Sequence, residues 1–211
     1  MTTTDGPASD APAGPATAER GGRRRRLLGL ALTVVALAVA LPAFVARAYA
    51  VPSDSMESTL HGCPGCENDH VLVDKLAYHF GTPRPGDIVV FVVPTSWRNS
   101  ELPGEADTDF IKRVIAVGGQ TVSCCDDRGR VMVDGRALDE PYIHFAPEYG
   151  PAVQARFGPV RVPDGQLWVM GDNRNDSVDS RAPNNGPVPV SDVIGKARMI
   201  VLPFGRFGGI Q

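Results

Sequence analysis

The stretch "DFIKRVIAV" (residues 109–117) is the strongest strand signal in this 211-residue chain. Successive side chains of a strand point to opposite faces. One face carries Phe110, Lys112, Val114 and Ala116, and the other carries Ile111, Arg113, Ile115 and Val117. Both faces are mainly apolar, so we expect this strand to be covered on both sides. Each face nevertheless carries one cation, either Lys112 or Arg113.

Lys112 has two alternative environments on such a face. Its stem can lie along the apolar surface while the ammonium reaches water at a strand end. Alternatively the amine is enclosed, and burial lowers its pKa from about 10.4 into the neutral range. A neutral lysine amine is a competent general base and can activate a serine hydroxyl. The Arg113 guanidinium stays charged, so it requires an anion or solvent.

Short apolar or alternating runs, separated by Gly, Pro and Asn/Asp turns, continue through the chain. The predicted strands are residues 70–78, 87–93, 109–117, 130–135, 166–171 and 192–202. The Asp-Gly dipeptide inside "VDGRAL" (133–138) predicts a tight hairpin. Without a convincing amphipathic helix after residue 50, the pattern predicts a mostly β domain, a folded sheet or partial barrel. About 123–165 is predicted to be a less regular insertion, and loops 94–108 and 182–189 to be exposed.

The N-terminal residues have a different composition. Residues 1–22 are rich in Pro, Ala, Gly and Thr, which predicts disorder. Four arginines (23–26) precede an uncharged apolar run (27–46), which as a helix spans roughly 30 Å, the thickness of a hydrocarbon core. Clustered Arg before the span favours a cytoplasmic N-terminus. We therefore expect a disordered cytoplasmic tail (1–22), a basic flank and transmembrane helix (23–50) and an extracytoplasmic β domain (51–211).

A cleaved signal peptide is the alternative for this N-terminal region. "ARAYA" (46–50) offers Ala48-x-Ala50 as a cleavage site. The apolar run is longer than the usual ~7–15 residues of a signal-peptide core, which favours an uncleaved anchor. In either case the rest of the chain lies outside the cytoplasm.

Charge and cysteine content limit the possible partners. The formal net charge of −3 gives no basic excess, so nucleic acid is not an expected partner. The four cysteines are Cys63 and Cys66 in "CPGC", and Cys124 and Cys125 in "CC". Disulfides are favoured in an oxidising compartment, although sequence leaves the pairing open. A structural zinc site that includes His61 and His70 is the alternative. We expect no cofactor and no metal in the chemistry.

Two polar stretches offer partners for Lys112. "VPSDSMEST" (51–59) holds Ser53, Ser55 and an exposed-looking Met56, although a plain juxtamembrane turn has a similar composition. "GDNRNDSVDSR" (171–181) is dense in hydrogen-bonding groups.

The second stretch has three interpretations. A calcium loop is disfavoured because Arg174 stands where a ligand oxygen is needed. A surface turn is the simplest reading. In the third, a charge-assisted pair of Asp179 and Arg181 holds a folded loop that presents Ser177. A Ser-His-Asp arrangement is disfavoured because the histidines are scattered and no G-x-S-x-G motif is present.

Taken together, these stretches resemble bacterial type I signal peptidases, membrane-anchored serine proteases that remove signal peptides from exported proteins. The resemblance covers most of residues 27–211 and rests on the order and spacing of its motifs. They are an N-terminal anchor, "PSDSM" (52–56), "RPGDIVVF" (84–91), "DFIKRVIAVGGQTV" (109–122), "GDNRNDSVDSR" (171–181) and "GRFGGI" (205–210).

By position, the resemblance implies that Ser55 is the nucleophile and Lys112 its general base. The Ser53 hydroxyl and the Ser55 backbone N–H would donate to the oxyanion. Further implied roles are an orienting hydrogen bond to the lysine amine from Ser177, and bracing of its loop by Asp179 and Arg181. The family fold is a coiled antiparallel β-sheet with an apolar surface against lipid.

The resemblance also implies the substrate and the location. Signal-peptide-bearing preproteins would be cut after small residues (Ala-X-Ala), bound as an extended strand. Pocket walls are expected around Met56 and on the strands within 70–93. Membrane lipid is an expected partner, and the location is the cell membrane. A monomer is favoured, although the sequence leaves the oligomeric state open.

Two positions depart from the family pattern. Asp54 stands where Gly is frequent, and its carboxylate would raise the Lys112 pKa unless it points to solvent. Ser58 stands where Pro is common, with a small expected effect. The Ala50–Val51 bond follows a motif that such an enzyme would cut, so self-cleavage is a hypothesis. Three rival interpretations remain: a self-cleaving Ser-Lys protease of another type, a non-enzymatic secreted β-domain protein, and a metal-binding module built on the cysteines.

Overall fold

A computed structural model describes residues 1–2, 26–34, 45–99 and 109–210 of the chain. It divides into two units, Met1–Ala43 and Phe44–Gln211, which are considered separately. In the first unit, residues 26–34 are helical. No helix within the described residues has the length and apolar character that a membrane crossing requires. Most of the expected tail, and residues 35–44 of the expected span, lie outside the described residues.

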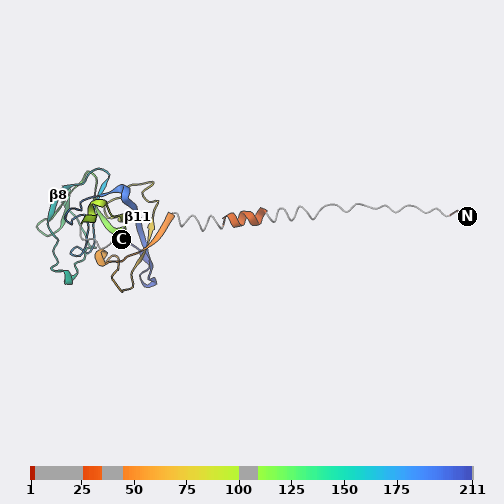
Figure 1. The fold of residues 1–211 in the computed structure, drawn as a ribbon, viewed down its shortest axis with the longest axis horizontal. Coiled ribbons are helices and arrows are strands. Elements are labelled where there is room, and N and C mark those ends of the chain that lie inside the picture. Colours follow the sequence, from red (N-terminus) through yellow and green to blue (C-terminus); the bar gives the residue numbers. More distant parts are fainter. Residues whose placement is uncertain (3–25, 35–44, 100–108, 211) are drawn as a thin grey trace. The chain divides into compact units, whose positions relative to one another are not determined.

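The second unit is built from two antiparallel sheets (Figure 1). The larger sheet has the strand order β1-β2-β11-β3-β4-β9-β10, with β12 paired to β11, and the smaller has the order β7-β6-β5-β8. The strands are β1 (Ala46–Ala50), β2 (His70–Asp74), β3 (Ile88–Val92), β4 (Asp109–Val117), β5 (Thr121–Cys124), β6 (Val131–Val133), β7 (Arg136–Ala137), β8 (Phe157–Arg161), β9 (Gln166–Met170), β10 (Val188–Pro189), β11 (Val193–Leu202) and β12 (Gly208–Gly209). The short 3₁₀ helices are η1 (Asp54–Met56), η2 (Thr95–Asn99), η3 (Pro147–Tyr149), η4 (Val190–Asp192) and η5 (Phe204–Arg206). The prediction of a mostly β, antiparallel fold is confirmed.

Strand β4 lies between β3 and β9 and is covered on both faces, as its sequence predicts. Val114 packs in one apolar cluster with β3 and β9, whereas Ile115 packs in another with residues of the smaller sheet. Lys112 pairs with Val89 of β3. A register shift between Val114 and Ala116 interrupts the pairing with β9.

Strand β1 changes the expected boundary between anchor and β domain. Ala46–Ala50, which the sequence predicts to be part of the anchor segment, pair antiparallel with β2 along their whole length. Pairing with β2 supplies hydrogen-bond partners to a backbone that would otherwise need water or a helix. The β unit therefore begins before residue 51.

The smaller sheet occupies much of the expected insertion at 123–165. Its β6–β7 hairpin turns at Asp134 (φ 49°) and Gly135 (φ 75°), the left-handed pair that a two-residue type I′ turn needs. Val122, Val131 and Val133 pack against Trp168 of β9, so this sheet is tied to the larger one.

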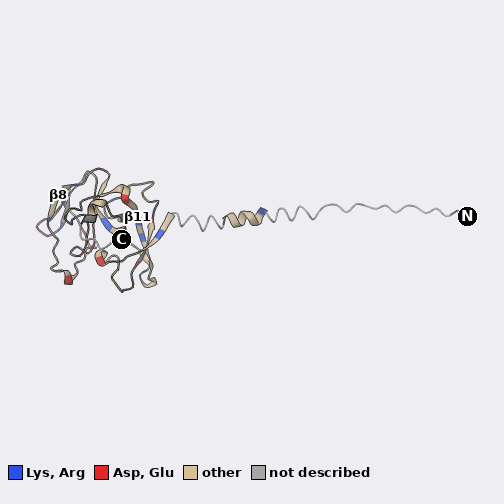
Figure 2. Cartoon of the chain, in the orientation of Figure 1, with Lys and Arg blue, Asp and Glu red and all other residues tan. Residues whose placement is uncertain are grey.

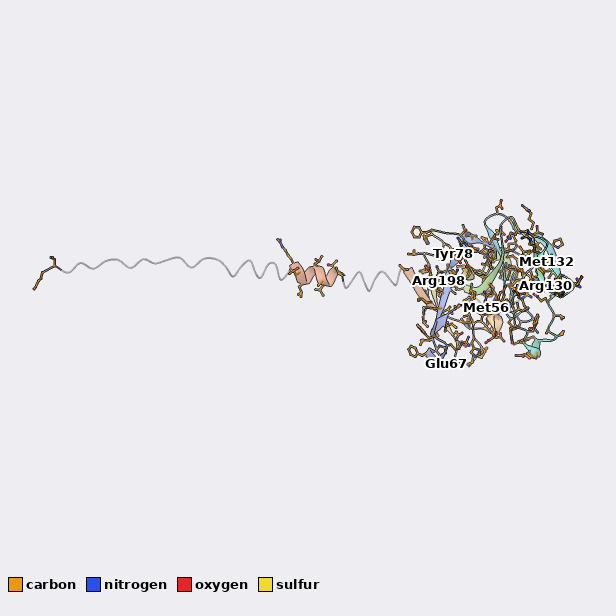
Figure 3. All side chains as sticks on the ribbon, turned by 180° about the vertical axis from the view of Figure 1, so that it is seen from behind. Met56, Glu67, Tyr78, Arg130, Met132 and Arg198 are labelled. Carbon is orange, nitrogen blue, oxygen red and sulfur yellow. A yellow bond between two sulfur atoms is a disulfide. The ribbon has the colours of Figure 1, made fainter. Side chains whose placement is uncertain are left out.

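The structure gives the environment of Met56, which follows Ser55 in the chain. Met56 is fully buried in a cluster with Val71 and Val90 and labelled in Figure 3, so the expectation of an exposed side chain is wrong. The 3₁₀ turn of η1 directs this side chain into the core.

The cysteines are bonded as Cys63–Cys66 and Cys124–Cys125. Charged residues of both signs are distributed over the β unit (Figure 2).

Candidate active site

Ser55 lies in the middle of η1 and is 7% exposed. The loop after β9 holds this turn through Asn173. Its backbone N–H donates to the Ser55 carbonyl (3.1 Å), and its side-chain Nδ2 donates to the Asp54 carbonyl (3.2 Å). Because Asn173 is itself buried, these two hydrogen bonds fix the backbone that carries the Ser55 hydroxyl.

Lys112 reaches the same point from β4. Its Nζ lies 2.6 Å from Ser55 Oγ, and the residue is 4% exposed. The Phe110 ring lies 5.4 Å from the amine. Burial lowers the pKa of Lys112 to about 8, although the nearby Asp179 carboxylate acts in the opposite direction. At pH 7 about one in ten of these amines is therefore uncharged, and the lone pair of an uncharged amine can accept the Ser55 proton.

Two further serines lie beside this pair. Ser53 Oγ is 3.2 Å from Ser55 Oγ, and Ser53 is an exposed residue. Ser177 Oγ is buried and has no hydrogen-bond partner among the described residues, so the expected bond to Lys112 is not formed. Gly171 permits this packing, since a Cβ there would lie 2.3 Å from Ser177 Oγ and 2.4 Å from the Ser55 carbonyl oxygen.

The loop that carries Ser177 is held by an ion pair. Arg181 Nη2 lies 2.6 Å from Asp179 Oδ2, and Arg181 Nε donates to Asp179 Oδ1 (2.8 Å). Asp179 also accepts from the Gly171 N–H. Burial opposes ionisation of Asp179, yet the charge and hydrogen bonds of Arg181 hold its pKa below the ordinary value. The Arg181 guanidinium additionally donates to the Arg174 carbonyl, which closes the loop.

The Arg113 guanidinium is paired with a carboxylate, as its permanent charge requires. Its guanidinium donates to both carboxylate oxygens of Asp172 (2.8 and 2.7 Å). The same carboxylate accepts from Thr59, three residues after η1. This buried network therefore connects β4, the loop after β9 and the nucleophile segment. The polar density of 171–181 indicated this loop, but no sequence signal identified Asp172 as the partner of Arg113.

The carboxylate of Asp54 lies at one side of the pair. It accepts from the Tyr149 hydroxyl at 3.5 Å and also faces Asp176. Burial first, and then Asp54, raise the pKa of Asp176 to about 6. Asp176, in turn, is among the carboxylates that raise the pKa of Lys112. The main influences on the pKa of Lys112 thus include Asp176, which the sequence did not single out, and not Asp54, for which an effect was expected.

A pocket of about 320 Å³ contains these groups. Its polar lining includes Ser53, Ser55, Lys112, Asp176 and Ser177. Its apolar lining includes Val71, Val90, Phe110 and Ile111, with Tyr49 and Ala50 of β1. Strands within 70–93 therefore supply walls, as expected, whereas Met56 is packed in the core instead. A serine hydroxyl, an amine of lowered pKa and an adjacent apolar pocket are the components of acyl transfer by a serine nucleophile.

Comparison with known proteins gives a consistent result. Residues 24–202 match the family model described as signal peptidase, peptidase S26. A signal peptidase I of Mycobacterium tuberculosis is 44% identical over 89% of this chain and 75% of its own length. A probable signal peptidase I of Mycobacterium leprae is 43% identical, over 86% and 77% respectively. A solved signal peptidase I of Enterococcus faecalis is 27% identical with a TM-score of 0.40, over 55% of this chain and 96% of that one.

Proposed function

The chain belongs to the signal peptidase family, peptidase S26, and from this membership we propose that it removes signal peptides from exported preproteins with a Ser55–Lys112 dyad. The family makes the chain a serine peptidase, a hydrolase. One observation carries the proposed mechanism, the 2.6 Å distance between Lys112 Nζ and Ser55 Oγ. Burial of the amine supports the assignment because it favours the uncharged form.

The reaction is acyl transfer in two halves. The Lys112 amine takes the Ser55 proton while Oγ attacks the carbonyl carbon of the last signal-peptide residue. The resulting ammonium then protonates the leaving amine, and the acyl group remains on Ser55 as an ester. In the second half, the amine removes a proton from water while the water oxygen attacks the ester. The ammonium then returns this proton to Ser55 Oγ as the bond between Oγ and the acyl carbon breaks, which releases the signal peptide and restores the hydroxyl.

Neighbouring groups have supporting roles in this mechanism. The Ser53 hydroxyl and the Ser55 backbone N–H stabilise the oxyanion, and loss of one such donor typically lowers the rate by ~10²–10³. The Ser177 hydroxyl, buried in the same pocket without a partner among the described residues, orients the Lys112 amine once substrate is bound. Asp179 and Arg181 hold the loop from which Ser177 projects.

The proposed substrate and location also rest on the membership of the chain in the signal peptidase family. The substrate carries small residues such as Ala at the first and third positions before the cut, and the apolar walls of Val71, Val90 and Ile111 suit their uncharged side chains. The substrate adds as an extended strand. The apolar segment that precedes β1 anchors the enzyme in the cell membrane with its N-terminus cytoplasmic and the β unit outside. The anchor raises the effective concentration of membrane-held precursors.

Cleavage of a precursor in detergent tests the dyad. Ser55→Ala and Lys112→Arg should both abolish cleavage, since a guanidinium does not give up its proton. Lys75→Arg, a lysine outside the pocket, is the matched control and should retain wild-type activity. Appreciable turnover by folded Lys112→Arg would contradict the assignment of the base.

A further inference from the structure

A second group of reactive side chains lies in the loop between η1 and β2, outside the pocket of Ser55. The ligand atoms of His61, Cys63 and Cys66 all lie within 4.8 Å of one another. Across the described residues, this is the one cluster of three or more His, Cys, Asp or Glu side chains with such spacing. All three residues are partly exposed, so solvent and ions have access to them.

The backbone around this group is held in place at the base of the loop. His61 and Asp69 are joined twice, because the Asp69 N–H donates to the His61 carbonyl (2.8 Å) and Asp69 Oδ2 accepts from the His61 N–H (2.7 Å). Arg206 donates to the same carboxylate. Gly62 packs directly against Val51, the residue after β1, since a Cβ at Gly62 would lie 2.3 Å from the Val51 carbonyl oxygen.

The turn inside the loop brings the two sulfurs together. Gly65 adopts a φ of +82°, which suits glycine, and the Cα atoms of Cys63 and Cys66 are 5.5 Å apart. The C-x₂-C spacing is the one that zinc sites use to place two thiolates on one ion. A third ligand from a neighbouring histidine gives a Cys₂His donor set, which suits thiophilic cations such as Zn²⁺.

Glu57 completes the arrangement. Its carboxylate contacts His61 Nδ1, which leaves Nε2 as the ring nitrogen free to bind an ion. Metal-binding histidines commonly donate their second ring N–H to a carboxylate, which orients the ring and makes it a better ligand. The pairing thus prepares His61 for coordination.

We propose that, in its dithiol state, the chain binds one thiophilic divalent cation through His61, Cys63 and Cys66, with Zn²⁺ as the ion that fits this donor set. The disulfide of the structure is the alternative, cation-free state, because its sulfurs are not thiolates. A phosphine reductant converts one state to the other: the S–S bond breaks, water supplies oxygen to the phosphine, and two thiols form. The cation then displaces both thiol protons.

The test uses the full-length chain in detergent and reads metal content, not peptidase activity, so it is independent of the proposed function. The chain is reduced anaerobically with a phosphine and titrated with Co²⁺, whose thiolate-to-metal charge-transfer band reports sulfur ligation. Zn²⁺ stoichiometry is then measured after removal of unbound ion. We expect one cation per reduced chain and none per oxidised chain.

Matched variants assign the ligands. The double variant Cys63→Ser/Cys66→Ser should lose binding, whereas Cys124→Ser/Cys125→Ser should retain it. Glu57→Ala should lower the affinity by about 10–100-fold, as expected for loss of a carboxylate behind a ligating histidine. The absence of binding to reduced wild type would overturn the proposal, and so would binding that survives loss of both Cys63 and Cys66. Because the oxidised wild-type chain is itself a control, the test does not depend on the folding of any variant.

Discussion

Lys112 Nζ lies 2.6 Å from Ser55 Oγ, although 57 positions separate the two residues in the sequence. The amine acts as a base only without its proton, and burial lowers its pKa to about 8. We therefore expect kcat/KM to rise about tenfold per pH unit up to roughly this value and then to level off. A pH–rate profile with a soluble peptide substrate measures this, and a rate that is unchanged on either side of pH 8 would contradict a lysine base.

The charge of Asp176 should affect the pH at which this pH–rate profile has its midpoint. Its negative charge raises the pKa of Lys112, and its own pKa of about 6 means that it is charged across most of the working range. Asp176→Asn removes this charge, so we expect the midpoint of the profile to move to lower pH and activity near neutral pH to increase. Asp164→Asn, at an exposed carboxylate outside the pocket, is the control and should leave the midpoint in place.

The sequence predicts much of this arrangement, for identifiable physical reasons. The strand at 109–117 is recovered with the same bounds because it is covered on both faces, and a covered strand is a long apolar run. Strand β1 is missed because "ARAYA" is short and continues an apolar segment. Its identity as a strand depends on pairing with β2, which is a long-range property.

The sequence likewise predicts some residues of the candidate site and misses others. The residue types and order of "PSDSM" and "DFIKRV" identify Ser55 and Lys112, whose contact the fold then brings about. The roles of Asp172 and Asn173 depend on side chains that meet across three segments of the chain, so the sequence marks their loop without assigning partners. Met56 is misjudged because a polar neighbourhood in sequence does not reveal which way a 3₁₀ turn directs one side chain.

The buried lysine should lower the stability of the fold. Its pKa is about 8 in the folded chain against an ordinary 10.5, so between these values the unfolded chain binds more protons and stability rises with pH. Below pH 8 both states are protonated and the full cost of burying the charge is present. We expect Lys112→Met to be inactive but more stable, by on the order of 2 kcal/mol.

The gain in stability of Lys112→Met should depend on pH, and this dependence identifies removal of the buried lysine charge as its cause. At a pH below 8, the variant should melt roughly 4–8 °C above wild type, since 1 kcal/mol corresponds to about 2–4 °C in a domain of this size. The difference should shrink as the pH rises towards 10.5. Thermal unfolding followed by circular dichroism measures both, and a gain that is constant with pH would point to packing and not to the lysine charge.

Substitution of Asn173 should lower the catalytic rate and leave substrate binding unchanged. Its side chain holds the Asp54 carbonyl, so Asn173→Ala loosens the turn that positions Ser55 while leaving the pocket walls in place. Small displacements of a nucleophile are costly, and we expect kcat to fall roughly 10–100-fold with KM little changed. Asn175→Ala is the matched control, because Asn175 bonds to Ala146 and not to the nucleophile turn. Equal losses in both variants would indicate a general effect on the loop.

The bond between Ala50 and Val51 should remain intact despite its resemblance to a cleavage site. Ala50 is paired with His70 in the sheet, the Val51 N–H donates to the Asp69 carbonyl, and Val51 is 1% exposed. Ala50 and Val51 already line the pocket of Ser55, but to be cut this bond would have to leave β2 and the core, at the cost of several hydrogen bonds and a buried side chain. Mass spectrometry of the purified wild-type chain should therefore give about 22.4 kDa. A new N-terminus at Val51 in wild type, absent from Ser55→Ala, would show that β1 opens far enough for the enzyme to cut itself.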